Sequence, residues 1–81
     1  MTANPNTPFI PKNANDALAL EIAQQFSDEA GLSFYRGLCA EYPRPMVYRA
    51  FREVLSVPLY KIRSSRRSLF TYLLRQYDQE T

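Results

Sequence analysis

Four cations and no acid occupy the segment 61–67, the densest charge in the chain: Lys61, Arg63, Arg66 and Arg67. Arginine carries a planar fork of N–H donors that suits phosphate oxygens. The two later arginines fall in the predicted first turn of a helix, where the helix dipole favours acids by about 0.3–1 kcal/mol per charge. Backbone N–H groups at a helix start also bind anions. This spacing therefore predicts a site for nucleic-acid phosphates.

An alternative interpretation of this cluster stays open at the level of sequence. Charge runs are commonly solvated surface, and exposed ion pairs contribute little to stability. The cluster would then pair with acids from the first half of the chain, namely Asp28, Glu29 or Glu41.

A second basic face is expected on the preceding helix, where Arg49 and Arg52 could help to bind phosphates, with Arg44 and Tyr48 near them. The short link at residues 42–45 also allows a helix-turn-helix arrangement in which this helix reads a groove. That link lacks the usual glycine, and Glu53 on the same face would repel phosphate. The predicted nucleic-acid-binding residues are Lys61, Arg63, Arg66, Arg67, Arg49 and Arg52.

The residue inventory argues against catalysis. The chain has no histidine, one cysteine and two glycines. It therefore lacks the commonest general base, a thiolate zinc site and a glycine-rich phosphate loop. We expect no enzyme activity, no metal and no cofactor. Cys39, on an apolar helical stripe, is expected to be a buried packing residue, and Tyr72 and Tyr77 are expected to pack in the core or at its rim.

Helical periodicity supplies the elements that position the basic segment. We predict helices over residues 15–26, 29–42, 44–56 and 65–79, with Pro43 and Pro58 as breaks and Ser64 or Ser65 as the cap of the last helix. The fold class is all-α, a small compact bundle of four helices or of three plus a short one. The predicted domains are a flexible, disordered Pro-rich leader at 1–12, in which Phe9 and Ile10 could dock, and a single helical domain at 13–81.

Charge is divided unevenly along the chain. Residues 1–42 hold two bases and five acids, a net −3, whereas residues 43–81 hold eight bases and three acids, a net +5. This imbalance suits a nucleic acid or an acidic protein as partner. No signal peptide and no apolar run of bilayer length is found, and one cysteine cannot form an internal disulfide. We expect a cytoplasmic protein without membrane contact.

Three segments carry a resemblance: FYRGLCAEYP, VYRAFREVL and IRSSRRSLFTYLLRQY. Over residues 14–78 the chain resembles small bacterial proteins of unassigned role. It is also similar to helical segments of plasmid and phage replication proteins, in which an Ile-Arg pair precedes a terminal helix. The resemblance implies a bacterial source and a role other than catalysis. It carries no catalytic or binding residue over to this chain.

Two function classes follow. The first is a non-catalytic nucleic-acid-binding accessory domain that contacts phosphates through the basic start of the last helix. The second is a protein–protein interaction module or a homodimer, anchored by the aromatic residues Phe34, Tyr48, Tyr60 and Phe70.

Overall fold

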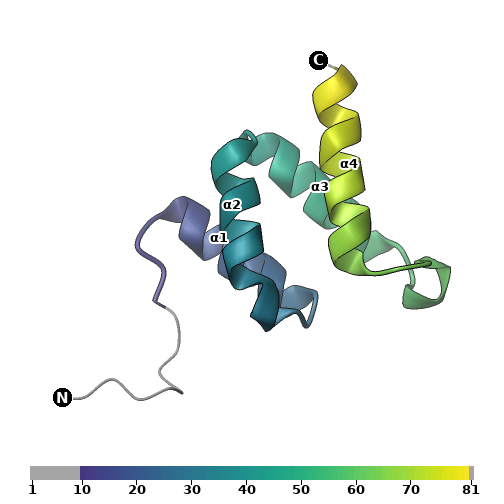
Figure 1. Ribbon diagram of the computed structural model, residues 1–81, viewed down its shortest axis with the longest axis horizontal. Helices are drawn as coiled ribbons and strands as arrows, with labels where there is room; N and C mark the ends of the chain where they lie inside the picture. Colours follow the sequence, from purple (N-terminus) through teal and green to yellow (C-terminus); the bar gives the residue numbers. More distant parts are fainter. Residues whose placement is uncertain (1–9, 81) are drawn as a thin grey trace.

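Helices account for the architecture of residues 10–80, which the computed structural model describes (Figure 1). This part of the chain holds four α-helices, α1 (Ala14–Gln25), α2 (Leu32–Glu41), α3 (Arg44–Ser56) and α4 (Arg66–Glu80). Two short 3-10 turns, η1 (Glu29–Gly31) and η2 (Leu59–Lys61), precede α2 and α4. No strand occurs within residues 10–80. The all-α prediction is confirmed.

Three of the predicted helices agree with the structure to within one residue at each end, because the local signals that end them are strong. Asn13 caps α1 by accepting a hydrogen bond from the backbone N–H of Asp16 at 2.9 Å. Pro43 precedes α3, and Pro45 lies in its first turn. Ser65 caps α4 by accepting from the backbone N–H of Ser68 at 3.0 Å.

The second predicted helix is wrong in its first turn. Residues 29–31 form the 3-10 turn η1, and the α-helix begins only at Leu32 and then continues through Gly37. The reason is the preceding turn, in which Ser27 adopts a left-handed conformation with φ 53°. Asp28, which directly precedes η1, provides no side-chain cap.

The helices form two antiparallel pairs, α1 with α2 and α3 with α4, which lie side by side in Figure 1. Phe26, directly after α1, joins the pairs through edge-to-face ring contacts. Its ring centroid lies 5.8 Å from Tyr35 of α2, 5.6 Å from Phe51 of α3 and 5.6 Å from Phe70 of α4. Each such contact adds about 0.5–1.5 kcal/mol beyond area burial. One aromatic cluster thus holds all four helices.

Buried apolar side chains from all four helices, together with Phe26, form the core. Leu55 lies outside it, 41% exposed in the last turn of α3. Cys39 is buried as expected. The buried side chains of the core are Leu18, Ala19, Ile22, Ala23, Phe26, Tyr35, Cys39, Val47, Ala50, Phe51, Val54, Phe70, Leu74 and Tyr77.

One ion pair ties the first helix pair together and was not predicted. Asp16, an acid in the first turn of α1, is buried and accepts a hydrogen bond from Arg36 Nε at 3.1 Å. This contact links the first turn of α1 to α2.

The predicted leader at residues 1–12 lies mostly outside the described part of the chain. Residues 1–9 and 81 lie outside the described part, so Phe9 and most of the predicted leader cannot be placed. Ile10 is 74% exposed and does not dock on the helices. Between residues 10 and 80, no helix is both long enough and apolar enough to cross a bilayer.

Candidate nucleic-acid interface

The basic segment lies in the connection between α3 and α4, which extends away from the α1–α2 pair (Figure 1). No residue of η2 is buried. Leu59 is 64% and Tyr60 84% exposed, so this connection presents apolar surface as well as charge. The predicted phosphate-binding residues run from the end of η2 into the first turn of α4: Lys61, Arg63, Arg66 and Arg67. The structure nevertheless gives them different surroundings.

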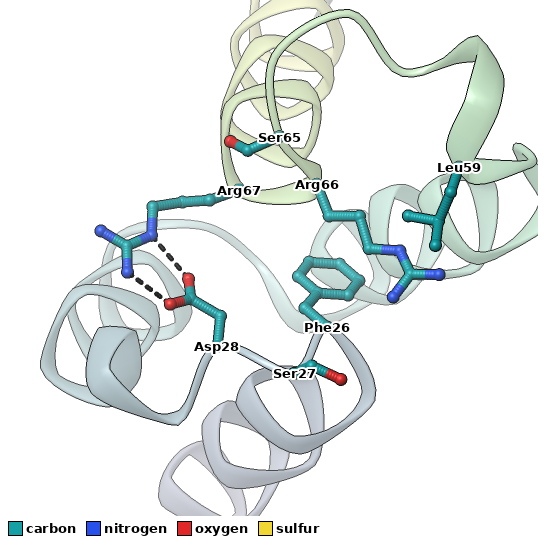
Figure 2. Close-up of a pocket in the computed structure, with 7 residues that line it drawn as sticks. All are labelled: Phe26, Ser27, Asp28, Leu59, Ser65, Arg66 and Arg67. Carbon is teal, nitrogen blue, oxygen red and sulfur yellow. Dashed lines mark hydrogen bonds and ion pairs between the residues drawn. The ribbon is translucent and has the colours of Figure 1, made fainter.

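Arg67 points away from the connection and toward the turn after α1 (Figure 2). Its Nε donates to Asp28 Oδ2 at 2.7 Å and its Nη2 to Asp28 Oδ1 at 2.8 Å. Such bidentate, charge-assisted pairs are the strong ones. The hydroxyl of Tyr35 donates to the same Oδ2 at 2.7 Å. We call these three residues, together with Gly31, the Arg67 network.

Electrostatics within the network stabilise the charged pair. Hydrogen bonds from Arg67 and then from Tyr35 lower the pKa of the Asp28 carboxyl below its ordinary value of 3.8. The side chain of Asp28 is 26% exposed and that of Arg67 is 41% exposed, so water weakens the attraction. Burial, followed by the hydrogen bond to Asp28, raises the pKa of Tyr35 well above its ordinary value of 10.0. Tyr35 therefore stays a neutral donor and Asp28 a charged acceptor.

Gly31 leaves the space that the Arg67 guanidinium occupies. A Cβ at this position would lie 2.3 Å from Arg67 Nη2 and 2.8 Å from Asp28 Oδ2. Contacts this short are not tolerated, so any other residue would displace the guanidinium. The other glycine differs, because a Cβ at Gly37 would meet nothing within 4 Å.

The turn after α1 brings Asp28 to the network. The backbone N–H of Ser27 donates to Gln24 O at 3.1 Å, and that of Asp28 donates to Ala23 O at 2.8 Å. This pair of bonds is a Schellman ending, in which the left-handed position is usually glycine and here is Ser27. The turn directs the Asp28 side chain toward the start of α4.

Arg66 is half-buried and lies between the end of α1 and the connection that leads into α4. Its Nη1 donates to the backbone oxygen of Gln25 at 3.3 Å, and its buried Nε has no partner within residues 10–80. Figure 2 shows its guanidinium beside the Phe26 ring and near Leu59. One of its N–H donors is thus used by the end of α1, and its Nε is shielded from solvent.

Lys61 and Arg63 are exposed, and neither takes part in an ion pair within residues 10–80. Both line an open groove of about 470 Å³ between the connection and α4. Apolar side chains from both elements and two serines form the rest of its wall: Val57, Ile62, Ser64, Ser68, Leu69 and Tyr72. We call Tyr60, Lys61, Arg63 and Tyr72 the open turn.

The second basic face is remote from the open turn. Arg49 Nη1 lies 3.7 Å from Glu80 Oε2, and its Cζ lies 3.8 Å from the centroid of the Tyr77 ring. Tyr77 and Glu80 belong to the last turns of α4, about 15 Å or more along the helix from its start at 1.5 Å per residue. Arg52 is exposed and lines a different depression, with Tyr48 and Glu53. The structure therefore does not bring the two predicted helpers to the connection.

Other contacts of α3 also turn inward on the protein. Arg44 Nη2 donates to Asn15 Oδ1 at 3.3 Å. The hydroxyl of Tyr77 donates a hydrogen bond to Glu53, and burial followed by this bond raises the pKa of Tyr77 to about 12.

The predictions for Cys39 and the tyrosines of α4 can also be compared with the structure. Burial raises the pKa of the Cys39 thiol to about 11, which keeps it protonated and unreactive. Tyr77 is a core residue as predicted, whereas Tyr72 is 57% exposed.

The basic segment 61–67 was predicted from its composition, but the separation of a paired Arg67 from Lys61 and Arg63, which are unpaired within residues 10–80, was not. Pairing with an acid of the first half was the alternative interpretation, and it is confirmed for Arg67 alone. Nothing in the spacing distinguished Asp28 from Glu29 or Glu41, and neither Gly31 nor Tyr35 was expected at this site. Among the four predicted anchors of a protein interface, Phe70 is wrong because it is fully buried.

Comparison with known proteins adds no further constraint on the site. No family model matches the chain, and neither the curated proteins nor the solved structures include a match to it.

Proposed function

We propose that this protein is a non-catalytic nucleic-acid-binding domain of the bacterial cytoplasm that contacts phosphates through Lys61 and Arg63. The observation that supports this function is the pair of exposed cations in the open turn, which no acid neutralises within residues 10–80. Unpaired cations on a protruding connection can approach a backbone of phosphates without breaking an internal contact. Each neutralised phosphate adds affinity that falls with salt.

This proposal narrows the predicted set of six residues. Arg67 would have to leave Asp28, and Arg49 would have to leave Glu80 and the Tyr77 ring, before either could bind a phosphate. Arg66 contributes at most part of its guanidinium. Arg52 remains free to act as a secondary contact at a distance from the main site.

The test is fluorescence anisotropy with labelled 12-nucleotide single strands and 12-base-pair duplexes, over a range of salt. The double variant Lys61→Ala/Arg63→Ala is expected to weaken binding and to reduce the salt slope by about 1.4–1.8, since each phosphate contributes about 0.7–0.9. The matched control is Lys12→Ala/Arg75→Ala, which removes the same charge from exposed positions outside the groove.

Two results would contradict the proposal. If both double variants weaken binding equally, affinity follows net charge and not the open turn. If the wild-type protein binds neither oligonucleotide at low salt, the function is wrong.

A protein-interaction role is the second candidate, and one observation favours it. Leu55, Leu59 and Tyr60 are 41%, 64% and 84% exposed near one another in the chain. A protein partner that covered these side chains would remove their apolar surface from water. Sedimentation velocity over a range of protein concentration separates the two functions, because a homodimer formed through this region should dissociate in a Leu59→Ser/Tyr60→Ser variant.

A further inference from the structure

The tyrosines of the open turn are exposed where the other described tyrosines are largely covered. Tyr60 is 84% and Tyr72 57% exposed, whereas Tyr35 and Tyr77 are buried and Tyr48 is 38% exposed. Exposing a large ring costs apolar burial, so these two positions add nothing to the core. Tyr60 directly precedes Lys61, and Tyr72 lines the groove together with Lys61 and Arg63.

The groove itself combines two kinds of surface. Its apolar wall is formed by Val57, Ile62, Leu69 and the Tyr72 ring, and its rim carries Lys61 and Arg63. Apolar surface of this kind suits the flat face of a base, and the two exposed cations beside it suit the phosphates that flank that base.

This combination discriminates between forms of nucleic acid. In a duplex, the faces of the bases are stacked on one another, and only their edges are accessible in the grooves. Reading those edges requires a helix or a two-stranded ribbon, and the exposed element here is a three-residue 3-10 turn. A single strand offers unstacked base faces, which bind aromatic side chains beside a positively charged groove.

We infer that the open turn binds single-stranded nucleic acid, with a base stacked on Tyr72 in the groove, a neighbouring base on Tyr60, and the intervening phosphates on Lys61 and Arg63. This inference rests on the phosphate contacts proposed above and adds the form of the ligand. Stacking tolerates any base, so the site has no strong sequence preference.

The experiment compares four labelled ligands at one salt concentration: a dT 12-mer, an rU 12-mer, a 12-base-pair duplex and an abasic 12-mer that keeps the phosphates but lacks bases. The single strands with bases are expected to bind at least tenfold more tightly than the duplex or the abasic strand. Tyr60→Ala and Tyr72→Ala should each lower single-strand affinity by about 5- to 100-fold, as for loss of one stacked base.

Matched variants separate stacking from other effects. Tyr60→Phe and Tyr72→Phe keep the ring and should retain affinity to within about twofold. Tyr48→Ala removes a partly exposed tyrosine of α3 that lies outside the groove and beside the secondary contact Arg52, so it should lower affinity much less than Tyr60→Ala or Tyr72→Ala. Circular dichroism of each variant checks that the helices are intact.

The outcomes are distinguishable. Equal affinity for single strand, duplex and abasic strand would overturn the stacking inference while leaving phosphate binding in place. Unchanged binding in both Tyr→Ala variants would do the same. Absence of binding to all four ligands would overturn the proposed function itself, and the inference with it.

Discussion

Arg63 and Arg67 are four positions apart in the sequence, yet in the described part of the chain one is exposed and unpaired and the other is half-buried in an ion pair. Arg67 is held by a bidentate ion pair with Asp28, above a glycine that leaves room for it. Arg63 is exposed at the rim of a groove and forms no ion pair within residues 10–80. A run of like charges is therefore not one functional unit. The Arg67 network connects the two helix pairs, whereas the open turn stays exposed.

The largest contrast is expected between two tyrosines. Tyr35→Ala should lower the free energy of unfolding by about 3–5 kcal/mol, because the side chain is fully buried among aromatic rings and its hydroxyl binds Asp28. Tyr60→Ala should change it by less than about 0.5 kcal/mol, since the side chain is 84% exposed. Urea denaturation followed by circular dichroism measures both.

Tyr35→Phe provides a milder version of the same test, in case the alanine variant does not fold. Losing only the hydroxyl bond to a charged carboxylate should cost about 1–2 kcal/mol. Equal stability of the Phe variant and the wild type would show that the network does not depend on this bond.

The two glycines should respond in opposite directions. Gly31→Ala is expected to cost about 1–2 kcal/mol, because the new Cβ displaces the Arg67 guanidinium. Gly37→Ala should add about 0.5–1 kcal/mol, because its Cβ meets nothing and alanine favours the interior of α2. The same denaturation series measures both, and a gain in the Gly31 variant would contradict the close approach.

Acid pH should weaken the Arg67 network. The pKa of Asp28 is lower in the folded protein than its ordinary 3.8, so the unfolded chain binds more protons at acid pH. The stabilisation by charged Asp28 is therefore complete above about pH 5 and is lost as pH falls through the folded pKa. Arg67→Gln should reduce this acid loss, as seen in urea midpoints from pH 7 to pH 3.

Arg75→Gln is the control, because Arg75 is an exposed arginine of the same helix. It should leave the acid dependence as it is in the wild type. If both variants reduce the acid loss equally, the dependence reflects overall charge and not the contact between Arg67 and Asp28.

The smallest effect is expected at the turn that carries Asp28. Ser27 has φ 53°, a conformation that costs a non-glycine residue about 1–2 kcal/mol. Ser27→Gly removes that cost and adds flexibility to the unfolded chain, for a net gain of about 0.5 kcal/mol. Thermal unfolding should show a slightly higher midpoint, and a lower one would mean that the serine side chain stabilises the turn.

Most of the fold could be predicted from local signals. The apolar stripe of α1 and the prolines around α3 act over a few residues, so they are readable in sequence order. A break at residues 27–28 was predicted, but nothing in the sequence indicated that residues 29–31 would form a 3-10 turn. The predicted helix over 29–42 therefore started too early.

The candidate site was predictable only as a cluster. Its location follows from the composition of the segment 61–67, but the pairing of Arg67 with Asp28 spans 39 positions and depends on how α4 packs. The need for glycine at position 31 depends on the Arg67 guanidinium packed against it, which the sequence does not show. Tertiary packing, and not residue type, decides which cations remain exposed.

The sequence separation of the Arg67–Asp28 pair also bears on the lifetime of the folded state. Each helix pair is built from neighbouring segments and should assemble early, because contacts close in sequence cost little loop entropy. The contact between Arg67 and Asp28 can form only once the two pairs have docked. Stabilisation that arises after the transition state slows unfolding without accelerating folding. Arg67→Gln should accordingly raise the unfolding rate in stopped-flow experiments and leave the folding rate nearly unchanged. This one ion pair would then prolong the lifetime of the folded state.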